Sequence, residues 1–91
     1  MIDELLQKDI VIFGAGSLSR NLPVTYPEIF DSLKICAVVD NDRRIVGNEL
    51  FGMKISGPEI LNRVRKDTIF ILIASSYVQE ISRQLQQMGF E

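Results

Sequence analysis

Two glycines that follow a short apolar segment are the residues of this chain best suited to binding chemistry. Residues 10–13 read Ile-Val-Ile-Phe and lead directly into Gly14, Ala15 and Gly16. In a strand–turn–helix unit, the first glycine permits a tight turn, the second lets the backbone approach a phosphate, and the N–H groups of the following helix attract an anion. The pattern therefore predicts a phosphate-binding turn, formed by Gly14, Ala15, Gly16, Ser17 and Leu18.

A second apolar segment ends in an acid where such a unit needs a ribose acceptor. Residues 35–39 lead into Asp40, at close to the spacing of about 20 residues that dinucleotide-binding sequences show. Asn41 continues a polar loop at the same edge. A strand-end cap or turn acid is the alternative role of Asp40. The nearby Arg43 and Arg44 would favour a 2′-phosphate, whereas Asp40 favours an unphosphorylated ribose.

A third apolar segment, residues 69–73, ends at Ala74 and Ser75. Because the carboxyl ends of parallel strands meet at one edge of a sheet, we expect these residues to line the same crevice as the glycine turn. The predicted small-molecule ligand is a nucleotide or a nucleotide-bearing cofactor. Its predicted binding residues are Gly14, Ala15, Gly16, Ser17, Leu18, Asp40, Asn41, Ala74 and Ser75.

The glycine pattern is incomplete, because Ser19 replaces the third glycine of the dinucleotide-binding fingerprint. A serine is larger than a glycine at a point where helix and strand pack closely, so we expect the turn to be slightly displaced. A strand–glycine turn without any ligand is the alternative. Ser17 and Ser19 can donate hydrogen bonds to a phosphate, and Arg20 can add a charge-assisted contact.

Residues suited to catalysis are scarce in this chain. It has no histidine, which excludes a histidine acid, base or metal ligand, and its one cysteine, Cys36, lies inside the second apolar segment. We expect Cys36 to be buried as a small hydrophobe, in keeping with a reducing compartment. No catalytic residue and no metal site are predicted, and the chain is not expected to carry a reaction alone.

Length and charge narrow the class of the protein. We expect the 91 residues to form one small domain, residues 1–91, and a net charge of −2 offers no basic face for a nucleic acid. The N-terminal residues lack the basic and apolar stretches of a signal peptide or a transmembrane span. We therefore expect a cytoplasmic domain with neither a nucleic-acid nor a membrane partner.

The apolar segments and the helix signals between them predict an α/β fold. The three segments are continuous, as expected for strands covered on both faces of a parallel sheet. Ser56 and Pro58 predict a helix that runs to about residue 66, and a second helix is predicted between Ser76 and a stop at Gly89. Right-handed crossovers place the strands in the order 3-2-1, a three-layer, Rossmann-like half of a doubly wound sheet.

Two connections are predicted to be irregular. Pro23 and Pro27 divide the first crossover into a short turn of helix after the glycines, a break near residues 21–25, and a second helix that begins at about Pro27. Residues 47–55 predict a small excursion or hairpin, in which Phe51 and Met53 are packing residues.

The predicted order leaves the first strand, residues 10–13, at an exposed apolar edge, which proteins usually cover. The sequence stops where a fourth strand would begin. Either it is a fragment of a longer protein, or another chain completes the edge; Ile2, Leu5 and Leu6 would cover part of it. We favour a fragment, with a homo-oligomer formed through this edge as a consequence.

Nearly the whole chain also resembles a group of known domains. The resemblance rests on the segments IVIFGAGSLSR, AVVDNDRRIVGNELFGMKISGPEIL and DTIFILIASSYVQEISRQLQQMGF. They are similar to the Rossmann-like domains of nucleotide-sugar epimerase and dehydratase relatives, to the C-terminal domain of sugar C-methyltransferases, and to CoA-binding-like modules of polysaccharide enzymes. The resemblance implies a nucleotide-sugar, NAD(P) or CoA-type ligand at Gly14, Gly16, Ser17 and Asp40.

Two functions remain open from the sequence. The first is a nucleotide-binding module that presents NAD(P) or a nucleotide sugar to the catalytic portion of a sugar-modifying or polysaccharide-biosynthesis enzyme. The alternative is a ligand-free, Rossmann-like domain for interaction or oligomerisation. An autonomous oxidoreductase or epimerase is disfavoured, because the sequence shows no acid–base pair.

Overall fold

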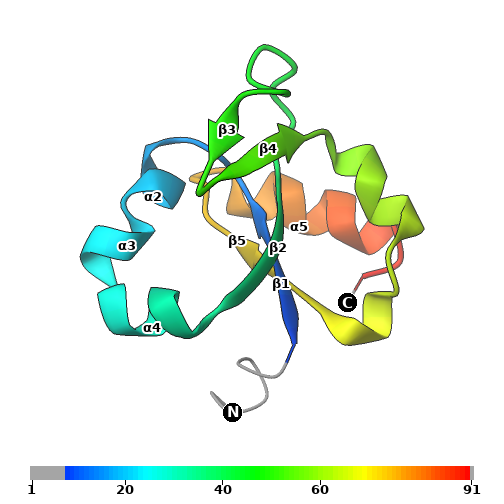
Figure 1. Ribbon diagram of the computed structural model, residues 1–91. Coiled ribbons are helices and arrows are strands. Elements are labelled where there is room, and N and C mark those ends of the chain that lie inside the picture. The colour runs from blue at the N-terminus through cyan, green and yellow to red at the C-terminus, as the bar shows by residue number, and fades with distance from the viewer. Residues whose placement is uncertain (1–7, 91) are drawn as a thin grey trace.

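A five-stranded sheet forms the centre of residues 8–90, the part of the chain that the computed structural model describes (Figure 1). The strands are β1 (Asp9–Phe13), β2 (Lys34–Val39), β3 (Glu49–Leu50), β4 (Met53–Ser56) and β5 (Ile69–Ile73). Their order is β3-β4-β2-β1-β5; β1, β2, β4 and β5 are parallel, and β3 is antiparallel to β4. The predicted α/β class and parallel sheet are confirmed.

The adjacent strands β4-β2-β1 have the predicted order 3-2-1. The prediction that residues 69–73 form the third of these strands is wrong. Residues 69–73 form β5, which pairs with β1 and not with β2. The place beside β2 is taken by β4, where Ile55 is the partner of Val38. β1 therefore lies inside the sheet, between β2 and β5, and is not the edge that was predicted at residues 10–13. The N-terminal residues expected to cover that edge lie outside the described residues.

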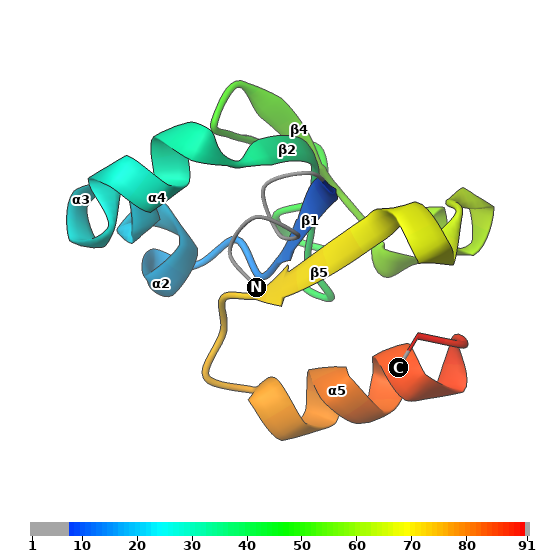
Figure 2. The same cartoon turned by 90° about the horizontal axis from the view of Figure 1, so that it is seen from below.

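Helices cover both faces of the sheet and give the fold three layers (Figure 2). One face packs against α5 (Val78–Gln87) and the 3-10 helix η1 (Pro58–Arg63). The first core lies there and consists of Val11, Phe13, Val39, Leu61, Ile81 and Leu85. A second core, near the β3–β4 hairpin, consists of Ala15, Val38 and Ile55.

The first crossover is divided into three short helices, α2 (Ser17–Arg20), α3 (Leu22–Thr25) and α4 (Pro27–Ser32). Pro23 lies in the first turn of α3, and Pro27 begins α4. Proline fits the first turn of a helix because the N–H that it lacks would have no partner there. The predicted short helix after the glycines and the helix that begins at Pro27 are confirmed, whereas the break predicted between them is wrong, because residues 22–25 form the helix α3.

The serine caps predicted for the later helices are wrong. Ser56 is the last residue of β4, and the segment after it is the 3-10 helix η1. Tyr77 and not Ser76 precedes α5, and no side chain caps that helix. A second 3-10 helix, η2 (Lys66–Thr68), leads into β5.

The predicted stop of α5 at Gly89 is confirmed. Gly89 has a φ of +96°, a conformation that favours glycine. The N–H of Phe90 donates to the carbonyl of Leu85 at 2.9 Å, and the N–H of Gly89 donates to that of Gln86 at 3.1 Å. These two bonds form a Schellman motif, which satisfies carbonyl groups that the end of the helix leaves free.

Two smaller predictions have opposite outcomes. Cys36 is exposed, so its predicted burial is wrong. The register of β1 against β2 shifts so that Ile35 and Ala37 both find partners and Cys36 is left over, as in a bulge. Phe51 and Met53 do pack against the second core, as predicted. The ring of Phe51 also lies 4.8 Å, centroid to centroid, from the ring of Phe30.

Candidate functional site

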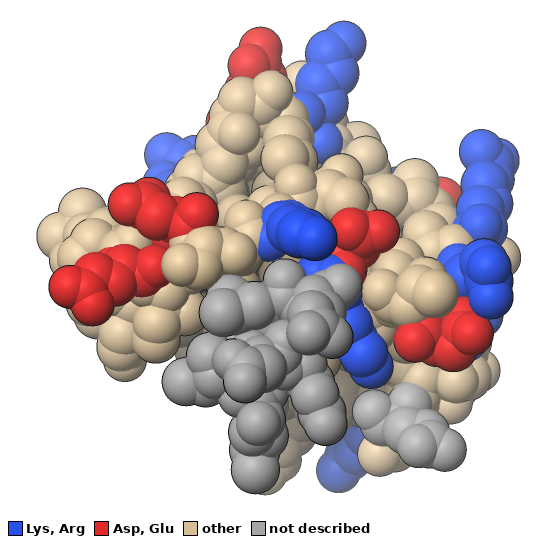
Figure 3. All heavy atoms as spheres, turned by 60° about the horizontal axis from the view of Figure 1, so that its bottom comes forward, with Lys and Arg blue, Asp and Glu red and all other residues tan. Residues whose placement is uncertain are grey.

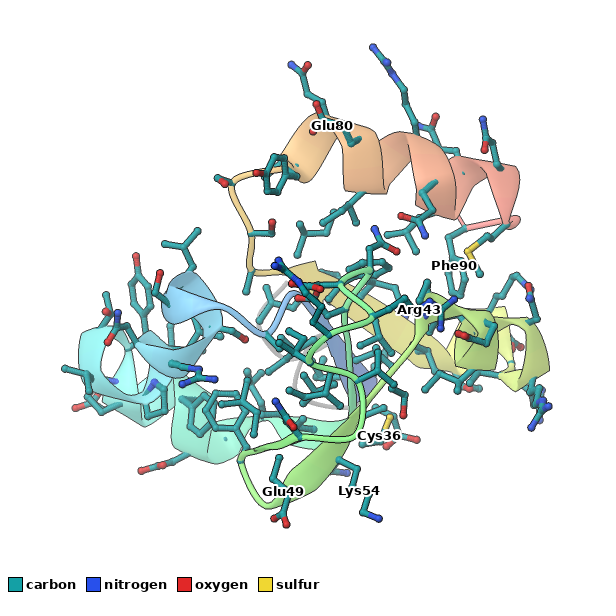
Figure 4. The ribbon with its side chains drawn as sticks, turned by 90° about the horizontal axis from the view of Figure 1, so that it is seen from above. Cys36, Arg43, Glu49, Lys54, Glu80 and Phe90 are labelled. Atoms are coloured by element: carbon teal, nitrogen blue, oxygen red, sulfur yellow. The ribbon has the colours of Figure 1, made fainter. Side chains whose placement is uncertain are left out.

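A cleft of about 720 Å³ opens at the carboxyl edge of the sheet, between the turn after β1, the loop after β2 and the segment after β5. Figure 4 views the molecule from this edge, with the loop that carries Arg43 near the centre and α5, whose first turn carries Glu80, at the top of the view. The cleft brings together all nine predicted binding residues: Gly14, Ala15, Gly16, Ser17, Leu18, Asp40, Asn41, Ala74 and Ser75.

Gly14 is required by the fold itself. Its φ is +117°, and a Cβ added to it would lie 2.5 Å from the carbonyl oxygen of Ala74. Its N–H donates to the carbonyl of Val39 at 2.8 Å, which extends the pairing of β1 with β2. This glycine lets the turn pass close to the end of β5.

Gly16 differs from Gly14 both in its φ and in the space around it. Its φ is −90°, which any residue adopts, and a Cβ added to it would meet none of the described atoms within 4 Å. Its carbonyl accepts the first hydrogen bond of α2, from the N–H of Arg20, at 3.0 Å. The turn therefore has open space in front of Gly16, on the wall of the cleft.

Asp40 connects the end of β2 to the glycine turn. One carboxylate oxygen, Oδ2, accepts a hydrogen bond from the N–H of Ala15 at 2.8 Å. The other, Oδ1, accepts from the N–H of Asp42 at 2.7 Å. The carboxylate predicted to receive a ribose thus has a backbone partner on each oxygen, as the alternative role of a turn acid requires.

The residues after Asp40 connect this loop to the rest of the cleft. The amide of Asn41 exchanges two hydrogen bonds with that of Gln84 on α5, at 2.8 and 2.9 Å. Asp42 accepts hydrogen bonds from the backbone and the side chain of Arg44. The side-chain bond is the main reason that the pKa of Asp42 lies below its usual range.

Neither arginine predicted to favour a 2′-phosphate lines the cleft. The guanidinium of Arg44 pairs with Asp42 at 3.0 Å, and that of Arg43 pairs with Glu59 at 2.7 Å. Both pairs are exposed to solvent, so each contributes little to stability. These two ion pairs nevertheless keep both guanidinium groups beside carboxylates of the chain.

The wall formed after β5 contains residues that the sequence patterns did not single out. Ala74 and Ser75 lie where predicted, and the hydroxyl of Ser75 accepts a hydrogen bond from the N–H of Tyr77 at 3.1 Å. Tyr77 and Glu80, at the start of α5, also line the cleft. Their position directly after the carboxyl end of a strand is the signal that would have indicated them.

Ser19 packs inside the molecule and does not line the cleft. It is 0% exposed, and its hydroxyl has no hydrogen-bond partner among the described residues. The third position of the fingerprint is therefore a packing position here, as expected, and the predicted contact of Ser19 with a phosphate is wrong.

The surface and the described residues show few other features. On the face in Figure 3, Lys and Arg side chains are interspersed with Asp and Glu, so this face has no continuous basic surface. Within residues 8–90, no group of three His, Cys, Asp or Glu side chains is placed to hold a metal ion. The same residues contain no helix with the length and apolar character needed to cross a membrane.

Solved structures that are similar to this chain include the following two. One, described as UDP-D-quinovosamine 4-dehydrogenase from Vibrio fischeri, aligns with a TM-score of 0.68 and 27% identity over 93% of this chain and 75% of that chain. The other, described as RSP in complex with β-NADH, aligns with a TM-score of 0.62 and 17% identity over 92% of this chain and 42% of that chain. No significant match was found among curated proteins.

The first structure is named for an enzyme of a nucleotide sugar, in keeping with part of the resemblance noted in the sequence. The resemblance to sugar C-methyltransferases stays a prediction. Residues 6–91 match the family model described as C2185-like, N-terminal. Because this match spans nearly the whole sequence, the chain belongs to the C2185-like, N-terminal family.

Proposed function

We propose that the cleft binds a nucleotide, either NAD(P) or a nucleotide sugar. The observation that carries this proposal is the open space at Gly16. Neither the φ of Gly16 nor any described neighbour requires a glycine at this position. Close approach of a phosphate to the backbone does require one, because a side chain would occupy the space that the phosphate needs.

The place of the cleft in the fold supports the proposal. β1 lies between β2 and β5, so the direction in which the strands follow one another reverses at β1. In open α/β sheets, ligands bind outside the carboxyl ends of the strands at such a reversal. Two proteins of similar fold, named for a UDP-sugar and for an NADH complex, agree with a nucleotide ligand.

The charges around the cleft favour NAD(H) over NADP(H). Both arginines of the loop after β2 are paired with carboxylates and lie outside the cleft. The charged residues that line the cleft are three acids and one base: Asp40, Asp42, Glu80 and Arg20. The three acids outnumber the one base, so they would repel a 2′-phosphate, and neither arginine of the loop after β2 lines the cleft to receive it.

We propose further that the chain does not catalyse a reaction by itself. It would present its nucleotide to the catalytic portion of a sugar-modifying or polysaccharide-biosynthesis enzyme in the cytoplasm. Residues 1–91 would then be one nucleotide-binding domain of a longer protein. Asp40, the one ionisable side chain among the nine proposed binding residues, already accepts two backbone hydrogen bonds.

Calorimetric titration of the wild-type chain and of glycine variants tests this site. NADH, NADPH, CoA and a UDP-sugar serve as probes, and we expect saturable binding of NADH or the UDP-sugar. Gly16→Ala is expected to weaken binding about tenfold, and Gly16→Val to weaken it further, because the side chain fills the phosphate position. The melting temperature of Gly16→Ala should stay unchanged, since the added Cβ meets no described atom within 4 Å.

Gly47→Ala is the matched control. Gly47 has a φ of +95° and lies outside the cleft, so alanine there should cost about 1 kcal/mol of stability while binding is unaffected. Tight binding that Gly16→Val leaves intact would place the ligand elsewhere. Absence of binding with all four probes would favour the second candidate function.

The second candidate is a ligand-free interaction domain, and the exposed apolar side chains of the first crossover favour it. Val24 is 79% exposed, and Leu18, Tyr26 and Ile29 are each about half exposed. Sedimentation analysis tests this candidate: it requires association that Val24→Glu abolishes and that nucleotides do not affect. A wild-type chain that stays monomeric at high concentration would exclude self-association as its function.

A further inference from the structure

We propose that Asp40 is a positioning residue, whose carboxylate holds the glycine turn in the conformation that receives the nucleotide. This inference rests on the proposed function of the cleft and replaces the ribose-acceptor role that the sequence predicts. Two hydrogen bonds carry it: Oδ2 accepts from the N–H of Ala15 at 2.8 Å, and Oδ1 accepts from the N–H of Asp42 at 2.7 Å.

The bond to Ala15 ties the end of β2 to the centre of the turn. Ala15 lies between the two glycines, is 1% exposed and follows the last residue of β1 by two positions, so its N–H has no partner in the sheet. Among residues 8–90, Asp40 supplies the acceptor. A buried N–H without an acceptor is costly, so the carboxylate decides whether the turn keeps this conformation.

The bond to Asp42 orients the carboxylate. An aspartate that accepts from the N–H two residues further on forms an Asx turn, and this turn leaves Oδ2 directed at Ala15. Asn41, which lies between Asp40 and Asp42 in the chain, exchanges two amide hydrogen bonds with Gln84 of α5. The loop after β2 is thus bonded to the glycine turn on one side of the cleft and to α5 on the other.

Both oxygens of Asp40 are already engaged by the chain. Each accepts an N–H, so a ribose would have to share these oxygens with the N–H groups or displace them. Removal of the carboxylate would then weaken binding through a looser turn, for ligands with and without the ribose hydroxyl alike.

Amide hydrogen exchange of the ligand-free chain, followed by NMR, tests the positioning role. In Asp40→Ala, we expect the Ala15 amide to exchange about tenfold faster, while amides of β1 and β5 change far less. Asp40→Asn keeps one acceptor oxygen and should fall between Asp40→Ala and the wild type. Asp67→Ala, which removes an exposed carboxylate outside the cleft, should keep the exchange of Ala15 slow. Equal acceleration of all amides in Asp40→Ala would overturn the proposal.

A ligand comparison separates positioning from ribose contact. The probes are NADH and its analogue without the 2′-hydroxyl of the adenosine ribose. We expect Asp40→Ala to raise both dissociation constants by the same factor, about tenfold. A factor that disappears with the analogue would assign Asp40 to the ribose and overturn the proposal. If the wild type does not bind NADH, the proposed function fails for this ligand, while the exchange experiment still decides whether Asp40 holds the turn.

Discussion

The two helical regions beside the cleft, α5 and the first crossover, are built differently. α5 is a single helix of ten residues that buries Ile81 and Leu85 against the sheet and ends in a Schellman motif. The first crossover consists of three helices of four to six residues, and α3 and α4 bury none of theirs. α5 therefore stabilises the sheet, whereas the first crossover presents the glycine turn and leaves apolar side chains exposed.

The difference separates stability from binding in this small domain. The apolar face of α5 provides part of the first core, and burial of such side chains is the main source of folding free energy. The glycine turn is held instead by polar contacts, among them the hydrogen bond from the N–H of Ala15 to the carboxylate of Asp40. Substitutions in α5 and in the first crossover test this contrast.

The largest expected effect is the loss of a core side chain from α5. Leu85→Ala should lower the free energy of unfolding by about 2–4 kcal/mol, because Leu85 is 6% exposed and lies in the first core. Val24→Ala in the first crossover should change it by less than about 0.5 kcal/mol, since Val24 is exposed. Urea denaturation measures both, and equal costs would refute the contrast.

An intermediate effect, of opposite sign, is expected in α2. Ser19→Ala should raise the free energy of unfolding by about 1 kcal/mol, because it removes a buried hydroxyl that has no partner among the described residues. Ser32→Ala in α4 is the control: its hydroxyl is exposed and donates to the carbonyl of Glu28, so little change is expected. A loss of stability in Ser19→Ala would mean that this hydroxyl has a partner in solution.

The smallest effect is expected at the Arg43–Glu59 pair. The hydrogen bond from Arg43 holds the pKa of Glu59 below its usual range. A carboxyl group whose pKa is lower in the folded than in the unfolded state adds stability above the ordinary pKa, and this stability is lost as the pH falls below about 4.

Glu59→Gln should therefore be slightly less stable than the wild type at pH 7 and equal to it in acid. Because the pair is exposed, high salt should reduce the difference at pH 7 as well. Urea denaturation at both pH values, at low and high salt, measures these differences. A difference that persists in acid would assign Glu59 a role other than this ion pair.

Much of the candidate site could be predicted from the sequence, because the signals that mark it are local. An apolar segment followed by Gly14 and Gly16, and another that ends at Asp40, are readable without knowledge of any partner. All nine residues singled out in this way line one cleft. Their binding role stays a prediction. Tyr77 and Glu80 were missed because the one signal for them, their position directly after the carboxyl end of a strand, was not used.

The strand order was less predictable, because pairing depends on residues far apart in the chain. β4 has four residues, of which Ile55 is the one fully buried, so its sequence resembles a hairpin arm more than a strand beside β2. The long apolar segment of β5 gives no sign that its partner is β1. The bulge that exposes Cys36 also arises from the pairing of two strands and leaves no local signal.

The sequence by itself determined the α/β class, the broken first crossover, the stop at Gly89 and the set of residues at the carboxyl edge. Periodicity, proline and glycine act on neighbouring residues, so each of these features is encoded within a few positions. Only the tertiary structure decided that β5 lies beside β1, that Gly14 serves the fold while Gly16 faces open space, and that Asp40 bonds to Ala15. These three features depend on which distant segments pack together. The free energy of that packing is a sum over contacts throughout the domain, so no short segment encodes it.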